Sequence, residues 1–292
     1  ARQVDADRAA GKKLGALAGL PIVVKDNINT KDMKTTGGTP SLRHFQPSKN
    51  APSVQKLIDA GAIVLGKSNL HEWAFGITST NFTLGTDPSG GAARPCKNPY
   101  DSSRIPGGSS GGTAVAIAAR FAPAGLGTDT GGSTRVPASF CGVVGYKPTF
   151  GTLPMAGIKS LSPTLDTAGV FARSVDDAAF FVSTLSRIEL AMSPVKGWRV
   201  GICHTPHWEL ASEDARRALQ DSARHFDKLG ARVVEAVVPV SALGLQAGSS
   251  THGHRFEAAV DPVQIAHADA YADTLARDGA VIASFAARKA DI

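Results

Sequence analysis

The chain has 292 residues, of which 42% are hydrophobic and 19% are charged, and its formal net charge is +6. This length suffices for one large α/β domain or two modest ones, and the apolar content excludes a disordered chain. The lysines and arginines are scattered rather than gathered in runs, so we interpret the positive charge as a solvated surface and expect no nucleic-acid partner.

The three cysteines, Cys96, Cys141 and Cys203, are odd in number and widely spaced, with no CxxC pair. This pattern argues against a disulfide framework and a structural zinc, and it predicts a reducing, cytoplasmic location. The N-terminus is polar and has no apolar core of a signal peptide. The longest weakly apolar run, residues 113–127, contains Arg120 and is too short to cross a bilayer, so we expect no membrane partner.

The first predicted elements form a strand–helix–strand unit. A β-branched run over residues 19–24 predicts a buried strand that ends at a polar loop. Ser53 is expected to cap a helix that ends at Gly61, and residues 62–65 predict a second buried strand. This order and spacing predict a βαβ unit within a parallel sheet.

The alanine-rich run over residues 113–119 contains neither proline nor glycine and predicts a buried helix. Ser110 or Gly111 is expected at the N-terminus of this helix. A change of character near residues 187–196 indicates a boundary in the chain.

Another strand–helix–strand unit follows this boundary. Its first strand is expected over residues 198–202, and its second over residues 233–238. Between them, Ser212 is expected to cap a helix that ends at Gly230. Residues 245–292 show a mostly helical pattern.

Two clusters combine glycine with serine or threonine, GGSSGG at residues 107–112 and GTDTGGS at residues 127–133. A phosphate-binding loop requires GxxxxGK[ST] or GxGxxG, and neither pattern is present. Clusters of this composition most often form a flexible linker or an ordinary turn. A third interpretation is a nucleophilic site, because a serine needs backbone N–H groups that face the developing oxyanion, and residues 130–133 can supply both.

A nucleophilic serine also needs a base that removes its proton. None of the eight histidines has a context that marks it as a base, and no GxSxG motif is present, so a Ser-His-Asp triad is disfavoured. A lysine can act as the base when it is neutral, which burial favours. Lys25, Lys67 and Lys147 each follow an apolar, strand-like run, and the pattern does not choose among them.

Three blocks of sequence, GLPIVVKDN (19–27), PGGSSGG (106–112) and GTDTGGSTRVPASFCGVVGYKPT (127–149), resemble in this order the amidase signature family of serine hydrolases. The match is clear over residues 19–175 and weak beyond residue 196. The resemblance implies an α/β fold with a mixed, largely parallel twisted β-sheet that helices cover on both faces. It also implies one domain over residues 1–292, with the catalytic core at 19–187 and a weakly matching α/β and then helical segment at 197–292.

The resemblance implies a Ser–cis-Ser–Lys triad formed by Lys25, Ser109 and Ser133, with Ser133 as the nucleophile and a cis peptide bond before Ser109. The expected oxyanion hole consists of backbone N–H groups, those of Thr130, Gly131, Gly132 and Ser133. Further residues of the same blocks are expected to hold the loops, with a substrate role open for the arginine: Ser110, Asp129 and Arg135. No metal and no cofactor are expected. Cys141 lies in an apolar setting and is expected to be an inert, buried thiol.

The activity implied is hydrolysis of a carboxylic amide, or of a related carbamate or urea C–N bond, by acyl transfer to Ser133. The resemblance leaves two alternatives, the glutaminase (A) subunit of a tRNA-dependent amidotransferase and a non-catalytic scaffold. The expected partner is a small-molecule amide substrate, and a homodimer is compatible with the sequence. Both ends are short for the family, so we expect truncation at both. The loop at residues 86–98 is longer than usual, and we interpret it as either a surface insertion or a gate over the pocket.

Overall fold

The chain divides into two compact units, Ala1–Leu190 and Ala191–Ile292, and this division falls within the predicted boundary at residues 187–196. The computed structural model describes residues 1–81, 96–188, 190, 194–204 and 208–236. The predicted helical segment at 245–292 and most of the 86–98 loop lie outside the described residues. The assignment of the chain to a single domain stays a prediction.

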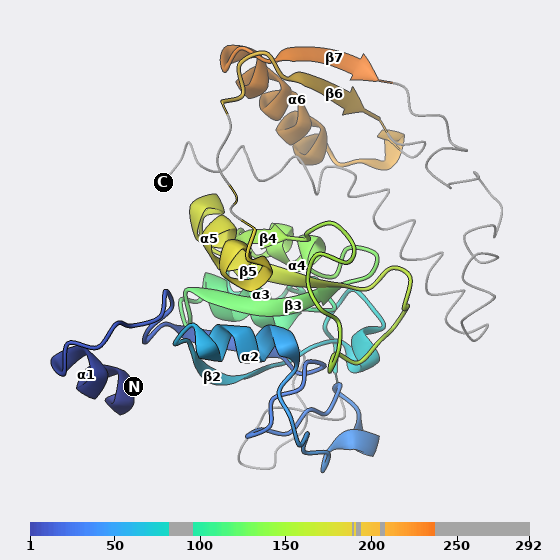
Figure 1. The fold of residues 1–292 in the computed structure, drawn as a ribbon. Coiled ribbons are helices and arrows are strands. Elements are labelled where there is room, and N and C mark those ends of the chain that lie inside the picture. The colour runs from blue at the N-terminus through green and yellow to red at the C-terminus, as the bar shows by residue number, and fades with distance from the viewer. Residues whose placement is uncertain (82–95, 189, 191–193, 205–207, 237–292) are drawn as a thin grey trace. The chain divides into compact units, whose positions relative to one another are not determined.

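The first unit contains a five-stranded sheet in the order β2-β1-β3-β5-β4 (Figure 1). Its strands are β1 (Pro21–Lys25), β2 (Ile63–Ser68), β3 (Ala124–Asp129), β4 (Val144–Tyr146) and β5 (Thr167–Ala172). β1 pairs in parallel with both β2 and β3, whereas β5 is antiparallel to β3 and to β4. Four strands therefore share one direction, which confirms the prediction of a mixed, largely parallel sheet.

The helices of this unit are α1 (Arg2–Ala9), α2 (Pro52–Asp59), α3 (Gly111–Ala118), α4 (Arg135–Phe140) and α5 (Val175–Ser186), with short 3₁₀ turns at Pro40–Leu42 and Glu72–Ala74. α2 contacts α5, and α3 contacts α4. These two pairs lie on opposite sides of the sheet in Figure 1. The prediction that helices cover both faces is confirmed. In the part of the chain that the structure describes, none of the helices combines the length and the apolar composition needed to span a bilayer.

The predicted βαβ unit is present as β1–α2–β2, with the two strands parallel. The predicted cap is wrong, because α2 begins at Pro52 and its N-cap is Ala51. Ser53 lies inside the first turn, where it is buried and its Oγ has no hydrogen-bond partner among the described residues. Proline explains the shift, since its fixed φ and missing N–H suit the first position of a helix.

β3 lies in the middle of the sheet although its sequence, AGLGTD, did not predict a strand. Its glycines give it a low strand propensity but allow close packing. A Cβ at Gly125 would lie 2.8 Å from side-chain atoms of Thr113 and Val23, and one at Gly127 would lie 2.6 Å from the ring of Phe171. Close approach to neighbouring elements therefore accounts for a central strand that the propensity of its residues does not favour.

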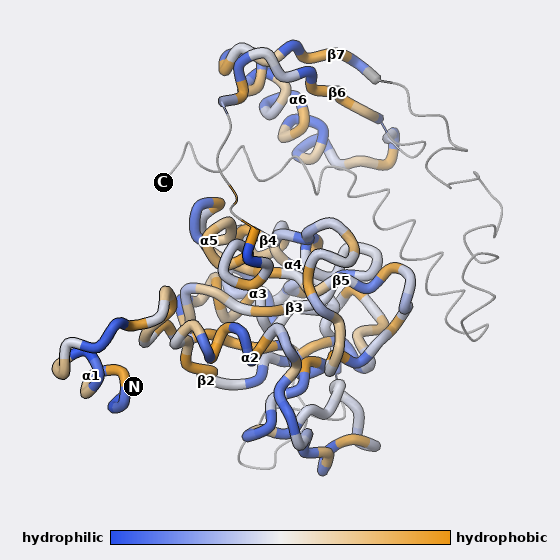
Figure 2. Tube along the Cα trace, in the orientation of Figure 1, coloured by the Kyte–Doolittle hydropathy of each residue, from blue (hydrophilic) through white to orange (hydrophobic). Residues whose placement is uncertain are grey.

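The core of the first unit lies between the sheet and the helices α2 and α5. Hydrophobic stretches coincide with the central strands in Figure 2, while the surrounding loops contain its most hydrophilic stretches. The buried members of this core include Ile22, Val24, Leu57, Leu126, Val170, Phe181 and Leu185. The core anchors β1 and β3, and the polar residues of interest lie where these two strands end.

The second unit contains β6 (Arg199–Cys203), α6 (Glu213–Lys228) and β7 (Arg232–Ala236), with a short 3₁₀ turn at Trp208–Leu210. β6 and β7 are parallel, so the second predicted strand–helix–strand unit is present. The Ser212 side chain accepts a hydrogen bond from the backbone N–H of Ala215 at 3.2 Å, as predicted for an N-cap.

Candidate active site

The candidate site lies at the edge of the sheet where β1 and β3 end. Because these strands are parallel neighbours, their carboxyl ends meet at one edge. β1 ends at Lys25, and β3 ends at Asp129. α3 begins at Gly111, directly after the two serines of GGSSGG, so three elements bring the predicted residues to one place.

Lys25 is fully buried, and its Nζ lies 2.7 Å from both Ser109 Oγ and Thr128 Oγ1. Burial lowers the pKa of Lys25 to about 7, because it disfavours the charged ammonium, while the negative charges of Asp129 and Asp166 oppose this shift. A substantial fraction of Lys25 is therefore neutral near neutral pH, and in that form Nζ can accept a proton from Ser109.

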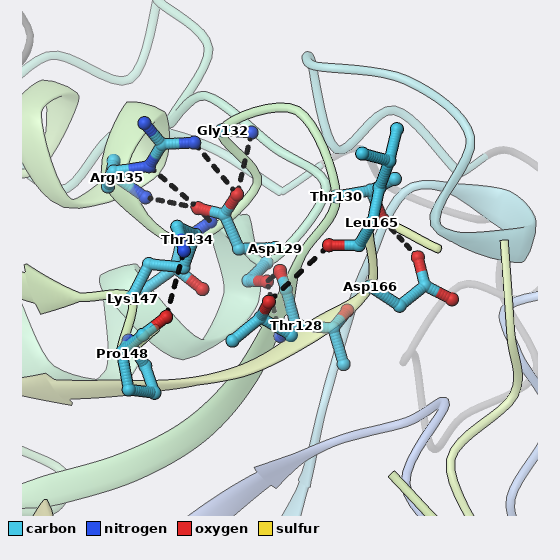
Figure 3. A network of polar contacts seen from close by, with 12 residues as sticks. Thr128, Asp129, Thr130, Gly132, Thr134, Arg135, Lys147, Pro148, Leu165 and Asp166 are labelled. Atoms are coloured by element: carbon cyan, nitrogen blue, oxygen red, sulfur yellow. Dashed lines mark hydrogen bonds and ion pairs between the residues drawn. The ribbon is translucent and has the colours of Figure 1, made fainter. Parts of the chain in front are cut away.

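The two other candidate lysines have different partners. Lys67 Nζ donates to Ile28 O at 2.6 Å and to Thr35 Oγ1 at 2.9 Å, and it forms an ion pair with Asp26 at 3.3 Å. Burial lowers its pKa to about 8. Lys147 Nζ donates to the carbonyl of Pro148 at 2.8 Å (Figure 3). Of the three lysines, Lys25 is the one that contacts Ser109.

A backbone hydrogen bond links the first serine loop (residues 107–112) to the second serine loop (residues 127–133). The Gly108–Ser109 peptide bond is cis, as the sequence resemblance implies. The next peptide group is held at both ends, since the Ser109 carbonyl accepts a hydrogen bond from the His71 N–H at 3.1 Å and the Ser110 N–H donates to the Ser133 carbonyl at 3.2 Å. Ser109 and Ser133 are both buried.

The side chain of Ser110 links the start of α3 to the end of β3. Its Oγ donates to the Thr128 carbonyl at 3.1 Å, and it accepts from the Thr128 N–H at 3.3 Å. Ser110 is fully buried, and these contacts replace the side-chain cap that an N-cap serine often makes. The geometry agrees with the expectation that Ser110 holds the loops.

The carboxylate of Asp129 organises the loop that carries Ser133 (Figure 3). It accepts hydrogen bonds from the N–H groups of Gly132 at 2.8 Å and Thr134 at 3.0 Å. It also accepts from Arg135 Nε at 3.1 Å and Nη2 at 3.0 Å. Asp129 is fully buried, so the paired guanidinium and the backbone donors compensate for the loss of its hydration.

The four predicted oxyanion donors do not have equivalent surroundings. The Gly132 N–H is engaged with Asp129. Within the described residues, the N–H groups of Thr130, Gly131 and Ser133 donate to no acceptor. This arrangement leaves these three of the four predicted donors available for an oxyanion.

Three residues of the site, Asn27, Thr128 and Asp166, were not singled out from the sequence. Asn27 Nδ2 donates to Thr128 Oγ1 at 3.1 Å, beside the contact from Lys25. Thr130 Oγ1 donates to Asp166 Oδ1 at 2.5 Å, and this carboxylate also accepts from the backbone N–H groups of residues 161 and 162. The three residues lie in segments that match the family, but their roles depend on contacts across the chain.

Cys141 lies beneath the first serine loop, where its Sγ donates to the carbonyl of Pro106 at 3.4 Å. Burial raises the pKa of this thiol to about 12, so it stays protonated at neutral pH. Among the residues with described positions, no group of three or more histidine, cysteine or acidic side chains could hold a metal ion.

Similar proteins have two kinds of names. A curated relative from Thermobifida fusca (strain YX), the A subunit of glutamyl-tRNA(Gln) amidotransferase, is 40% identical over 256 residues, which cover 82% of this chain and 50% of that protein. The crystal structure of the same subunit from Thermotoga maritima is 29% identical with a TM-score of 0.72, over 96% of this chain and 63% of that chain. The structure of the native peptide amidase from Stenotrophomonas maltophilia is 31% identical with a TM-score of 0.71, and the match covers 97% of this chain and 64% of that chain. The chain thus spans about half the length of the curated relatives it matches.

These relatives contradict the prediction that a small-molecule amide is the partner and that no nucleic acid takes part. Their name refers to a tRNA and to one subunit of a larger enzyme. The prediction rested on scattered basic residues, which describe the average surface of a single chain. The average distribution of charge over the surface does not reveal partners that a chain binds through other subunits of an assembly.

The match to a family is extensive. A family model covers the part of the chain that contains the three sequence blocks and the mixed sheet. The same part contains Lys25 and Ser109, which contact each other. The family model described as Amidase matches residues 1–259, and on this ground the chain belongs to the amidase family.

Proposed function

We propose that the protein cleaves an amide C–N bond by acyl transfer to Ser133, with Ser109 and Lys25 as the proton relay. The observation that carries this proposal is the 2.7 Å contact between Lys25 Nζ and Ser109 Oγ in a buried setting. Burial lowers the pKa of Lys25 to about 7, so a substantial fraction of this base is neutral near neutral pH. The loop that holds Ser109 is hydrogen-bonded, through the Ser110 N–H, to the carbonyl of Ser133.

In the proposed reaction, Ser133 Oγ attacks the amide carbonyl carbon and transfers its proton to Ser109, whose own proton passes to Lys25 Nζ. The N–H groups of Thr130, Gly131 and Ser133 stabilise the oxyanion. Ser109 then donates its proton to the amide nitrogen and regains one from Lys25, the C–N bond breaks, and an amine or ammonia leaves. A water molecule, deprotonated through the same relay, releases the acid from Ser133.

The test of this proposal is covalent labelling of the folded protein by an organophosphorus probe, with peptide mapping of the labelled residue. Wild-type protein should be labelled at Ser133, and Ser133→Ala should lose both labelling and turnover. Ser103→Ala, which alters an exposed serine, serves as the matched control and should behave as wild type. Labelling that persists in Ser133→Ala would contradict the choice of nucleophile. Folded wild-type protein that takes up no probe would support the scaffold alternative instead.

A second, finer candidate is that the amide is the side chain of glutamine and that the chain is the A subunit of a tRNA-dependent amidotransferase. The names of the curated relatives, at 38–40% identity, favour this candidate over a general amidase. It implies partner subunits that use the released ammonia on a tRNA-bound substrate.

Ammonia release from glutamine and from simple carboxylic amides tests this second candidate. The candidate predicts a higher kcat/KM on glutamine, with a further increase when partner subunits are added. A higher kcat/KM on simple amides, with no response to added subunits, would contradict the glutaminase candidate and leave acyl transfer to Ser133 intact.

A further inference from the structure

Ser79 is fully buried beside the first serine loop, 30 residues before Ser109. Its single hydroxyl group makes two hydrogen bonds to that loop. It donates to the carbonyl of Ser109 at 3.3 Å and accepts from the N–H of Gly111 at 3.0 Å. One side chain from a distant segment thus bridges the residues on either side of Ser110.

The packing around Ser79 leaves no space for a larger neighbour. A Cβ at Gly108 would lie 2.8 Å from Ser79 N, and a Cβ at Gly111 would lie 2.3 Å from Ser79 Oγ. Two glycines of GGSSGG are therefore required by the proximity of Ser79. Ser79 itself has φ +54°, a left-handed conformation that residues other than glycine seldom adopt.

The segment that carries Ser79 is anchored elsewhere in the first unit. Asn81 Nδ2 donates to the carbonyl of Gly38 at 2.7 Å. The hydroxyl groups of Thr78 and Thr80, which flank Ser79, lie 2.7 Å apart. The Asn81 contact ties the segment that carries Ser79 to Gly38, which lies outside the serine loop.

From this geometry we infer that Ser79 is a positioning residue that orients the Ser109 side chain between Lys25 and Ser133, and this inference rests on the proposed function. The Ser79 hydroxyl and the His71 N–H hold the Ser109 carbonyl, while the N–H of the same peptide group is bonded to Ser133. The plane of this peptide group fixes the direction of the Ser109 Cα–Cβ bond. A small rotation moves Ser109 Oγ out of line for transfer of the proton.

The test is a double-mutant cycle with Ser79→Ala and Ser109→Ala, read as the rate at which an organophosphorus probe labels Ser133 in the full chain. Ser79→Ala is expected to slow labelling about 10- to 100-fold. In the Ser109→Ala background, the same substitution is expected to change the residual rate by less than about twofold, because Ser79 acts through Ser109. An equal slowdown in both backgrounds, or none in either, overturns the inference.

Two further variants separate positioning from general destabilisation. Ser68→Ala removes another buried hydroxyl, which bonds to Thr113 Oγ1 at 2.6 Å, and it should label at the wild-type rate. Ser79→Cys keeps a weaker donor and acceptor, and the probe should label Ser133 in this variant at an intermediate rate.

If Ser79→Ala does not fold, the labelling rate of Ser79→Cys tests the inference, and a wild-type rate in that variant overturns it. Wild-type protein that is not labelled at Ser133 refutes the proposed function, whereas labelling at Ser133 with an additive cycle refutes the role of Ser79 alone.

Discussion

Lys25 Nζ and Ser109 Oγ lie 2.7 Å apart, although 84 positions separate these residues in the chain. Both side chains are fully buried, and a second hydroxyl, that of Thr128, contacts the same Nζ. The contact places a lysine with a pKa of about 7 next to the hydroxyl group of Ser109. The peptide group that follows Ser109 donates a hydrogen bond to the carbonyl of Ser133.

The first prediction concerns the pH dependence of turnover. Because Lys25 accepts a proton only when it is neutral, kcat/KM should rise with pH through about 7 and level off above it. Lys25→Ala should remove this rise and most of the activity, leaving a residual rate that grows with hydroxide concentration. Lys147→Ala is the control and should keep the wild-type profile. The profile of kcat/KM against pH on a reporter anilide is the measurement, and a Lys25→Ala variant that retains the rise would show that another group is the base.

The second prediction concerns stability. The pKa of Lys25 is about 7 in the folded protein and about 10.5 as the ordinary value, so between these pH values the unfolded chain holds a proton that the folded protein has released. The free energy of unfolding should therefore increase with pH in this window, by about 1 kcal/mol per pH unit from this residue. Urea unfolding at several pH values should give a shallower increase for Lys25→Met than for wild type. Equal slopes would show that burial does not keep Lys25 neutral.

The third prediction concerns the buried carboxylate of Asp129. Asp129→Asn removes the ion pair between Asp129 and Arg135 and weakens the hydrogen bonds that order residues 130–135. The free energy of unfolding should fall by about 3 kcal/mol, and turnover should be lost with it, because the loop positions Ser133. Asp101→Asn removes an exposed carboxylate that is paired with Arg104, and it should change stability by less than about 1 kcal/mol. Chemical denaturation measures both variants, and equal effects would contradict a special role for Asp129.

The fourth prediction concerns the close packing of the first serine loop. A Cβ at Gly112 would lie 2.4 Å from the Asn69 carbonyl oxygen, so Gly112→Ala must displace either α3 or the loop that follows β2. We expect a loss of about 1–3 kcal/mol in stability and a drop in activity. A Cβ at Gly66 would meet no atom within 4 Å, which makes Gly66→Ala the matched control. Thermal unfolding compares the two, and a Gly112→Ala variant as stable as Gly66→Ala would refute the packing argument.

Local patterns in the sequence were sufficient for several elements. The apolar runs predicted β1, β2, β6 and β7, and a polar cap with a terminal glycine predicted α6. These features depend on neighbouring residues, so they can be inferred without knowledge of the fold. The motif blocks then directed attention to Lys25, Ser109 and Ser133, and their catalytic roles stay predictions.

Other features depended on contacts between distant segments. The strand β3 was not predicted because its glycines satisfy a packing requirement set by Phe171 and Val23 rather than a local preference. The hydrogen bond between Asp129 and Gly132 and the bridge made by Ser79 also depend on how distant segments pack, so they could not be predicted from the sequence. The sequence by itself determined which residue types and local elements are present. Only the tertiary structure decided which buried polar groups meet, because burial and hydrogen bonding between distant residues arise when the strands and loops pack together.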